Sequence, residues 1–335
     1  MRILICKFAG LRGALAVTAS LRAIKEVHPG ANVTYITLPG AEMATQGCPV
    51  ITETVTYNLN NKVSQFAALV SHLRRQDFDY AIALSSHRMA HTLVALSGAT
   101  RRICAGKAPF YLAPFFHQQV RGLLVDPHEA ARDHAVFSEI FNIAAEVPPM
   151  WFASSRMDSH GLLVEPQKYL VIHPGASQPS QILEIDKWAQ ATRELLAAGL
   201  IERVVVSAGP ASEERIMADA LCGLIGPAAF STRGQLSLPQ LALLLKEARL
   251  FMGTDSAILQ LASAVKVPVL GVYGPSNYNR SRPWGTLSRA VRIDTTKFEG
   301  EDINDYNARM NRAMGRITAQ QIFRAADELL RISKV

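Results

Sequence analysis

A short polar turn at residues 253–257 is the strongest candidate for a ligand site. It reads Gly-Thr-Asp-Ser-Ala, follows the apolar residues 250–252 and opens a stretch of helix-forming residues. The backbone amides at a helix N-terminus bind phosphate, so Asp255, Ser256 and Ala257 could face an anionic group. Asp255 or Ser256 could equally do no more than cap the helix. The pattern predicts either a phosphate site or a plain helix start.

Two other loops carry small and polar residues after β-rich runs. Residues 173–181 include Ser177, which a diphosphate could meet, and residues 207–213 include Gly209 and Glu213. Glu213 could accept hydrogen bonds from ribose hydroxyls or merely favour a helix N-terminus. A plain turn is the alternative for the first loop, because Pro and Gly mark any strand exit. Three such loops on one sheet edge would strengthen one another as a ligand site.

The elements that would position these loops alternate between strand-like and helix-like runs. Such alternation is typical of a doubly wound parallel sheet, so we expect an α/β protein with two Rossmann-like halves and a ligand cleft between them. In the first half we expect strands at residues 2–8, 32–38 and 79–84, and helices at 14–27 and 62–75. In the second half we expect strands at 169–173, 203–207, 250–252 and 267–273, and helices at 187–196, 212–224, 238–248 and 257–265.

The join between the halves and the end of the chain also have recognisable patterns. Pro148-Pro149 and the polar residues 154–161 are typical of a linker. A last amphipathic helix is expected over residues 318–332, with Thr318 as its N-cap.

Length and composition favour a two-domain globular protein. The 335 residues exceed the size at which one hydrophobic core usually stops growing, and 49% are apolar against 19% charged. The sequence has no apolar run of membrane-spanning length and its N-terminus lacks the features of a signal peptide, so we expect a cytoplasmic protein. The four cysteines are far apart in sequence, which predicts reduced, mostly buried thiols and no metal site.

A formal net charge of +7 favours an anionic partner. A nucleotide sugar, a phosphorylated glycolipid and the anionic inner face of a membrane all fit. Nucleic acid is not expected, because the basic residues are scattered and no basic helix or aromatic RNA-binding signature accompanies them.

Four motifs, in a fixed order, resemble the ADP-heptose:lipopolysaccharide heptosyltransferases, which form glycosyltransferase family nine. That family has H-P-G-A-S, then G-G-P-x-E, then D-[ST]-G-x-x-H-L-A, then P-x-x-x-x-[FY]-G-P. Here residues 173–177, 208–213, 255–262 and 268–275 stand in these places, with further matches at 99–103, 234–238 and 316–318. Each motif alone is weak, but the set is specific and covers nearly the whole chain.

The resemblance implies a GT-B fold, in which two Rossmann-like domains face a central cleft. An acceptor-side domain would span residues 1–155, a nucleotide-sugar-binding domain 165–315, and the C-terminal helix within 316–335 would pack back on the first domain. The implied activity is inverting, metal-independent transfer of a heptose from ADP-heptose to a hydroxyl of a sugar or lipid-linked acceptor. No cofactor is implied, and peripheral contact with the inner membrane fits such an acceptor.

The resemblance also implies site residues. Gly10 and Arg12 would lie on the acceptor side. The donor would contact Ser177, Gln181, Gly209, Glu213, Asp255, Ser256, Ala257 and Gln260.

The chain departs from the family pattern where that pattern carries chemistry. Arg12-Gly13 replaces the family's Gly-Asp, whose Asp is taken as the general base. Gln181 stands where the family has a Lys, and Ala257 and Gln260 occupy the helix in which the family has a His. The catalytic residue is therefore unknown from the sequence.

These departures leave alternatives open. Arg12 cannot be the base, because a guanidinium keeps its proton, but it could hold an anionic acceptor or the leaving diphosphate, or be a solvated loop cation. His87, His91 and His117 are candidate substitute bases. The protein could be an active heptosyltransferase, a related transferase with another donor or acceptor, or a non-catalytic homologue that binds a nucleotide sugar.

Overall fold

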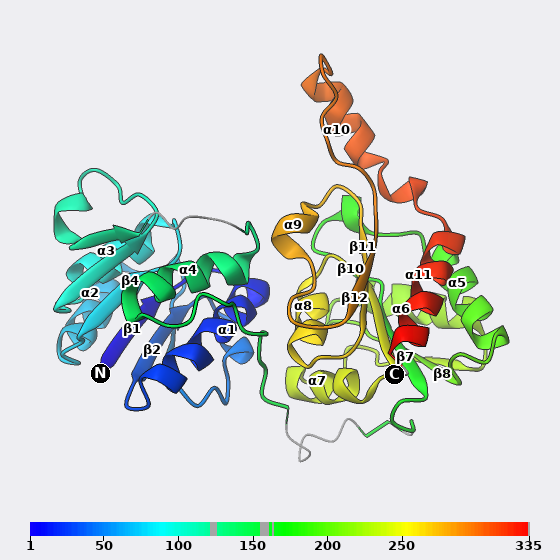
Figure 1. Ribbon diagram of the computed structural model, residues 1–335, viewed down its shortest axis with the longest axis horizontal. Coiled ribbons are helices and arrows are strands. Elements are labelled where there is room, and N and C mark those ends of the chain that lie inside the picture. Colours follow the sequence, from blue (N-terminus) through cyan, green and yellow to red (C-terminus); the bar gives the residue numbers. More distant parts are fainter. Residues whose placement is uncertain (121–125, 155–160, 163, 334–335) are drawn as a thin grey trace. The chain divides into compact units, whose positions relative to one another are not determined.

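The chain divides into two compact units. The computed structural model describes residues 1–120, 126–154, 161–162 and 164–333 (Figure 1). The units are Met1–Ala153 and Ser154–Val335. Most of the expected linker, residues 155–160, lies outside the described residues.

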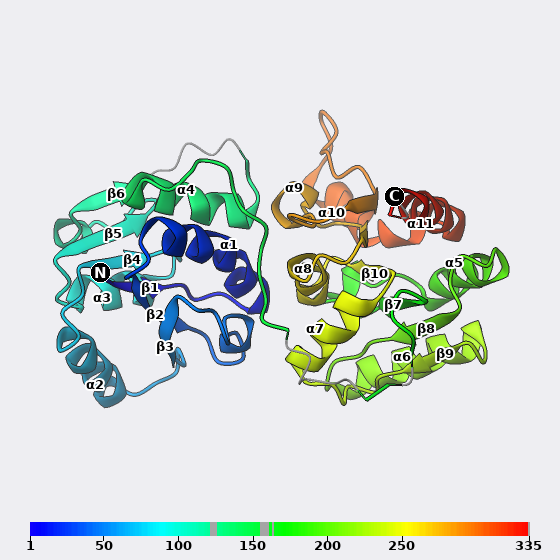
Figure 2. The same cartoon turned by 60° about the horizontal axis from the view of Figure 1, so that its bottom comes forward.

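The first unit contains a six-stranded parallel sheet with the order β3-β2-β1-β4-β5-β6. Strands β1, β2 and β4 are mostly buried because helices cover both faces of the sheet. Helices α1 and α4 pack together on one face, and α2 and α3 lie against the other (Figure 2). In chain order the elements are β1 (Arg2–Cys6), α1 (Leu11–Val27), β2 (Asn32–Thr37), η1 (Glu42–Ala44), β3 (Ile51–Thr56), α2 (Val63–Arg74), β4 (Tyr80–Ala83), α3 (Arg88–Leu96), β5 (Arg101–Ala105), η2 (Ala113–Phe115), β6 (Gln118–Val120) and α4 (Glu129–Phe141).

The second unit repeats this plan with the strand order β12-β11-β10-β7-β8-β9. Helices α5, α6 and α11 pack into one buried cluster with the sheet, and α7 and α8 contact each other. The elements are β7 (Tyr169–His173), η3 (Pro179–Gln181), α5 (Ile185–Ala197), β8 (Arg203–Val206), α6 (Ser212–Ile225), β9 (Ala229–Ser231), α7 (Leu238–Glu247), β10 (Leu250–Thr254), α8 (Ala257–Ala264), β11 (Val269–Tyr273), α9 (Tyr278–Ser281), β12 (Ser288–Arg292), α10 (Ile303–Asn311), η4 (Met314–Arg316) and α11 (Ala319–Ile332).

Both sheets reverse their strand order at one place. In each unit the first strand pairs in parallel with the fourth, β1 with β4 and β7 with β10. In open α/β sheets, ligands bind at the carboxyl ends of the strands beside this reversal. The expected doubly wound architecture is confirmed, and each unit has one carboxyl edge beside such a reversal.

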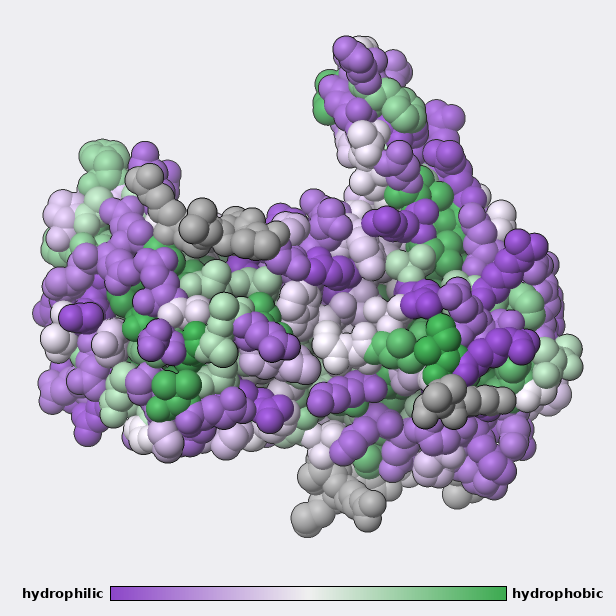
Figure 3. Space-filling model, in the orientation of Figure 1, coloured by the Kyte–Doolittle hydropathy of each residue, from purple (hydrophilic) through white to green (hydrophobic). Residues whose placement is uncertain are grey.

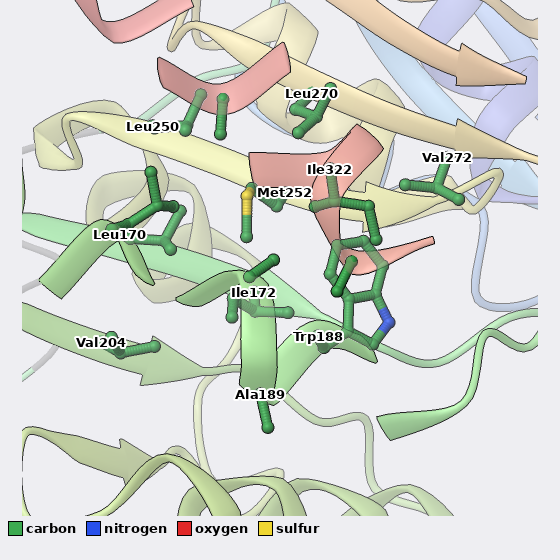
Figure 4. Close-up of a cluster of buried hydrophobic side chains, with 14 of the residues drawn as sticks. Leu170, Ile172, Trp188, Ala189, Val204, Leu250, Met252, Leu270, Val272 and Ile322 are labelled. Atoms are coloured by element: carbon green, nitrogen blue, oxygen red, sulfur yellow. The ribbon is translucent and has the colours of Figure 1, made fainter. Parts of the chain in front are cut away.

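Helix α11 packs on the second unit, which corrects the expectation that it returns to the first domain. Its apolar residues Ile322, Ala326 and Leu329 are buried in the same cluster as Trp188 of α5. Figure 4 shows Ile322 beside Trp188. The amphipathic stripe finds its apolar partner on the adjacent helix and sheet of its own unit. Thr318 is the N-cap, as expected, and accepts a hydrogen bond from the Gln321 amide at 3.2 Å.

Several elements were not expected from the sequence. They include the strands β3, β6 and β9 and the helices α3, α4 and α10. The segment that contains α10 extends away from the second sheet, and its surface is largely hydrophilic (Figures 1 and 3). The cysteines are free thiols, and Cys6, Cys48 and Cys104 are buried. Among the helices that the structure describes, none is both long enough and apolar enough to cross a membrane.

Candidate functional site

Three loops meet at the carboxyl edge of the second sheet, as the sequence predicts. They follow β7, β8 and β10, which are neighbouring parallel strands, so all three leave the sheet at one edge. The Thr254 hydroxyl donates to the Gly175 carbonyl at 2.7 Å, which joins the first and third loops. His173 Nδ1 lies 3.1 Å from the Ser207 hydroxyl, which joins the first and second. The three loops therefore form one connected group beside the point where β7 pairs with β10.

The carboxylate that reaches these loops belongs to Glu214. Its Oε2 accepts a hydrogen bond from the Gly209 amide at 2.6 Å. A Cβ at Gly209 would lie 2.6 Å from this oxygen, so the glycine makes room for the carboxylate. Burial lowers the pKa of His173, and attraction to Glu214 opposes that shift.

Glu213, the residue expected to bind ribose, is exposed in the first turn of α6. A hydrogen bond from its own backbone amide and one from Ser212 lower the pKa of its carboxyl. The adjacent carboxylates of Glu213 and Glu214, in the first turn of α6, thus point in different directions. The sequence alone did not show which of the two turns toward the sheet.

Asp255 is held in place by a buried network around Ser281. Only 3% of Asp255 is exposed, and its Oδ2 accepts a hydrogen bond from the Ser281 hydroxyl at 3.0 Å. The Ser281 carbonyl in turn accepts from Gln260 Nε2 at 2.6 Å and from the Tyr273 hydroxyl at 3.1 Å. Ser256 is the N-cap of α8 and accepts from the Leu259 amide at 3.3 Å. The cap is therefore Ser256, while Asp255 is oriented by α9, and Ala257 begins the helix.

Gln181 connects the loop after β7 to the loop after β11. Its Nε2 donates to the Ser276 hydroxyl at 2.8 Å, and its Oε1 is buried with no hydrogen-bond partner among the described residues. Gln260 Oε1 is also buried and has no hydrogen-bond partner among the described residues. Both amide oxygens could accept a hydrogen bond from a bound hydroxyl. Ser177, by contrast, is exposed on its loop.

A cavity of about 450 Å³ lies beside these loops. Its lining includes Ser276, which contacts Gln181, and Tyr273, which belongs to the Ser281 network. Arg292, at the end of β12, also lines it, and its guanidinium lies 4.8 Å from the centre of the Tyr278 ring. The residue at position 181 is not a cation, but Arg292 contributes a positive charge to the lining of this cavity. The sequence analysis missed Arg292 because β12 carries no recognisable motif.

The first unit has a buried cluster of charges at the corresponding edge. Lys7, directly after β1, forms ion pairs with Glu129 at 3.1 Å and Asp133 at 2.5 Å, and donates to the Gly13 carbonyl at 2.8 Å. Burial alone would lower the pKa of Lys7, but attraction to the two carboxylates outweighs it and raises the pKa. Burial raises the pKa of Asp133 to about 6 against the opposing attraction of Lys7. The sequence did not single out any of these three side chains.

The Glu129 carboxylate fills the space beside Gly13. A Cβ at Gly13 would lie 2.7 Å from Glu129 Oε1 and would collide with the Cβ of Ala9. Gly10 has open space around it, and Arg12 is partly exposed in the first turn of α1. At the position where the resemblance places a carboxylate, the structure therefore has one, but it comes from α4.

The three candidate histidines have different surroundings. His91 is buried with its Nε2 3.2 Å from Cys104 Sγ, and burial followed by the nearby His87 lowers its pKa. His117 precedes β6 and its Nδ1 accepts from the Arg102 amide, so it lies at the amino edge of the sheet. His87 follows β4, is exposed, and caps α3 by accepting from the Met89 amide at 3.2 Å. His87 alone of the three is an exposed side chain at the carboxyl edge.

Comparison with known proteins identifies the family. The sequence model of glycosyltransferase family 9 (heptosyltransferase) matches residues 66–307. The chain is 23% identical to lipopolysaccharide heptosyltransferase 3 of Escherichia coli over 337 residues, which covers 94% of this chain and 95% of that protein. Its fold resembles E. coli heptosyltransferase WaaC with ADP, with a TM-score of 0.80, 16% identity and coverage of 98% of this chain and 100% of that one. The E. coli ADP-heptose LPS heptosyltransferase II gives a TM-score of 0.80 at 16% identity, with both chains covered at 100%. The chain thus belongs to glycosyltransferase family 9, the heptosyltransferases, and is a transferase with the GT-B fold.

Proposed function

We propose that the protein transfers a heptose, with inversion, from ADP-heptose to a hydroxyl of a sugar on a lipid-linked acceptor. The observation that carries this proposal is the convergence of the loops after β7, β8 and β10, with Asp255 held at the N-terminus of α8. Amides at a helix start, glycine-lined loops and a fixed carboxylate suit a diphosphate and the hydroxyls of a sugar.

The donor contacts follow from the chemistry of each group. The diphosphate would lie along the loop that contains Ser177 and along the amides at Ser256 and Ala257. Gly209 and Glu214 would meet the ribose, because a carboxylate accepts hydrogen bonds from neighbouring hydroxyls. The buried oxygens of Gln181 and Gln260 would accept from sugar hydroxyls, and Arg292 would supply the positive charge that Gln181 lacks.

Relatives support this choice of substrates. The chain resembles proteins whose names give ADP-heptose and lipopolysaccharide as substrates, and WaaC has been solved with ADP and with ADP-2-deoxy-2-fluoro heptose. The proposed transfer needs no metal ion, because amide dipoles and Arg292 would balance the leaving diphosphate. Inversion follows if the acceptor oxygen displaces the diphosphate directly in a single step.

The test is to titrate ADP, GDP, UDP and ADP-heptose by calorimetry and then to assay transfer with EDTA present. We expect ADP-containing ligands to bind more tightly than the others, and a product whose anomeric configuration is opposite to that of the donor. Binding with no turnover would support a non-catalytic homologue, and turnover of another donor would support an adapted transferase.

Asp255→Asn separates donor binding from stability. The change keeps the shape of the side chain and removes its charge. Because hydrogen bonds to a charged group contribute about 1.5–3 kcal/mol, we expect donor affinity to fall about tenfold or more. Asp219→Asn is the matched control, since Asp219 lies on α6 of the same unit and forms a solvent-exposed ion pair with Arg233 at 3.6 Å. Equal donor affinity of both variants would exclude Asp255 from the donor site.

The acceptor and the membrane would be met by the first unit, from the cytoplasmic side. Phe110 is 88% exposed, and Tyr111 and Phe115 are about half exposed in the loop after β5. Figure 3 shows hydrophobic residues at the upper end of this unit, where that loop lies in Figure 1. Exposed aromatic side chains suit the interface of a lipid bilayer. Phe110→Ser/Phe115→Ser should reduce co-sedimentation with vesicles of phosphatidylglycerol and phosphatidylethanolamine, and unchanged sedimentation would exclude this contact.

A further inference from the structure

The proposed transfer requires a group that removes the proton of the acceptor hydroxyl. Such a general base contributes about 10²- to 10⁴-fold to the rate. The need for this group rests on the proposed function, and the charged cluster of the first unit offers a candidate for it.

The Glu129 carboxylate lies at the carboxyl edge of the first sheet, beside the β1/β4 reversal. Lys7, the residue after β1, fixes it at 3.1 Å, and Lys7 is itself fixed by the Gly13 carbonyl at 2.8 Å. Glu129 is the first residue of α4, which packs on α1, so both helix starts lie at this edge. The carboxylate is therefore held by a buried cation at the place where ligands of such sheets bind.

Access to solvent separates Glu129 from the other groups of the cluster. The Glu129 side chain is 29% exposed, whereas those of Asp133 and Lys7 are 7% and 5% exposed. A base must reach a bound hydroxyl, and Asp133 is enclosed by the protein. Lys7 is kept protonated by its two partners, so it cannot accept a proton.

We propose that Glu129 is the catalytic base and that it replaces, from α4, the carboxylate that Gly13 cannot provide. The separation of 2.7 Å between a Cβ at position 13 and Glu129 Oε1 is comparable to that between Cβ and a carboxylate oxygen within an aspartate. Glu129 thus places a carboxylate oxygen in the space that a side chain at position 13 would enter. The absence of a side chain at Gly13 is what admits it.

In the proposed reaction, a Glu129 oxygen accepts the proton of the acceptor hydroxyl while the hydroxyl oxygen forms a bond to the anomeric carbon of the donor sugar. The bond between that carbon and the diphosphate oxygen breaks, and its electron pair leaves with the nucleoside diphosphate. The protonated Glu129 then returns its proton to water.

The first experiment compares Glu129→Gln with wild type in the transfer assay. We expect kcat to fall at least 100-fold, with the affinity for ADP and the melting temperature nearly unchanged, because Asp133 still neutralises Lys7. Glu139→Gln is the control, since Glu139 is exposed on the same helix and contacts Gln118. His87→Gln tests the rival base. A Glu129→Gln enzyme with a wild-type kcat, or loss of kcat only in His87→Gln, would overturn the proposal.

The second experiment moves the carboxylate from position 129 to position 13. It tests the proposal even if the Glu129→Gln protein fails to fold. Ala9→Gly/Gly13→Asp/Glu129→Ala places an aspartate at position 13 and removes both side chains that would collide with it. Its partner, Ala9→Gly/Gly13→Asn/Glu129→Ala, differs only in carrying an amide. We expect the variant with the aspartate to exceed the variant with the asparagine at least tenfold in kcat, and equal rates would overturn the proposal. Wild-type protein that transfers no sugar from any donor would instead refute the proposed function.

Discussion

Gly13→Ala is the substitution whose effect the structure determines most directly. The added methyl group would collide first with the Cβ of Ala9 and would also lie 2.7 Å from Glu129 Oε1, which is about 0.8 Å inside the ordinary contact distance of about 3.5 Å. Neither neighbour moves easily, since Lys7 holds Glu129 and Ala9 belongs to the turn before α1. Overpacking of this kind costs about 1–3 kcal/mol, so we expect that loss in the free energy of unfolding.

Urea unfolding followed by circular dichroism measures this loss. Gly30→Ala is the matched control, because a Cβ at Gly30 meets nothing within 4 Å, and its effect should stay within about 0.5 kcal/mol. If crowding is the cause, Ala9→Gly should recover part of the loss in the Gly13→Ala protein, as a double-mutant cycle would show. Gly13→Ala as stable as wild type would refute the crowding, and with it the claim that Glu129 fills this space.

Three further predictions concern charge, capping and the donor loops. Asp133 has a pKa of about 6 when folded against 3.8 as a free group, so the folded state binds the extra proton and stability falls as pH rises from about 4 to about 6. Relative to Asp133→Asn, the wild-type free energy of unfolding should therefore decrease over that range, and an increase would contradict the assignment. Thr318→Ala should cost about 0.5–2 kcal/mol in thermal or urea unfolding, because it removes the α11 cap, and no cost would mean that packing alone defines the helix start. Ser281→Ala removes the hydrogen bond to Asp255 and should weaken ADP binding in calorimetry, whereas Ser288→Ala on β12 should not. Equal binding by both serine variants would show that the Ser281 network does not orient the donor site.

The sequence predicted the sheets because their strands are apolar and regularly spaced. The runs that became β1, β2, β7 and β10 have buried residues on both faces, which leaves little choice of structure. The short strands β6 and β9 have three residues each and depend on pairing with their neighbours, so local sequence could not identify them. The packing partner of α11 could not be predicted either. An amphipathic stripe indicates that one face of a helix is buried, but it does not identify the surface that covers this face.

The three loops at the carboxyl edge of the second sheet could be predicted because each follows a strand directly. Local order along the chain then placed Asp255 and Ser256 correctly at the start of α8. Glu214 was missed because the choice between adjacent carboxylates depends on the direction of the first helical turn. Lys7, Glu129 and Asp133 were missed because more than a hundred residues separate Lys7 from its partners, and no local motif records such a contact.

The central claim is that the chain transfers a sugar from a nucleoside diphosphate donor. The most direct measurement is mass spectrometry of a heptose-free lipopolysaccharide core acceptor after incubation with ADP-heptose and purified protein. The proposed function predicts a product heavier by one heptose residue, one ADP released for each transfer, and strong loss of both in Asp255→Asn. An unchanged acceptor and no released nucleotide with any ADP-, GDP- or UDP-sugar, from a protein that melts cooperatively, would contradict the claim.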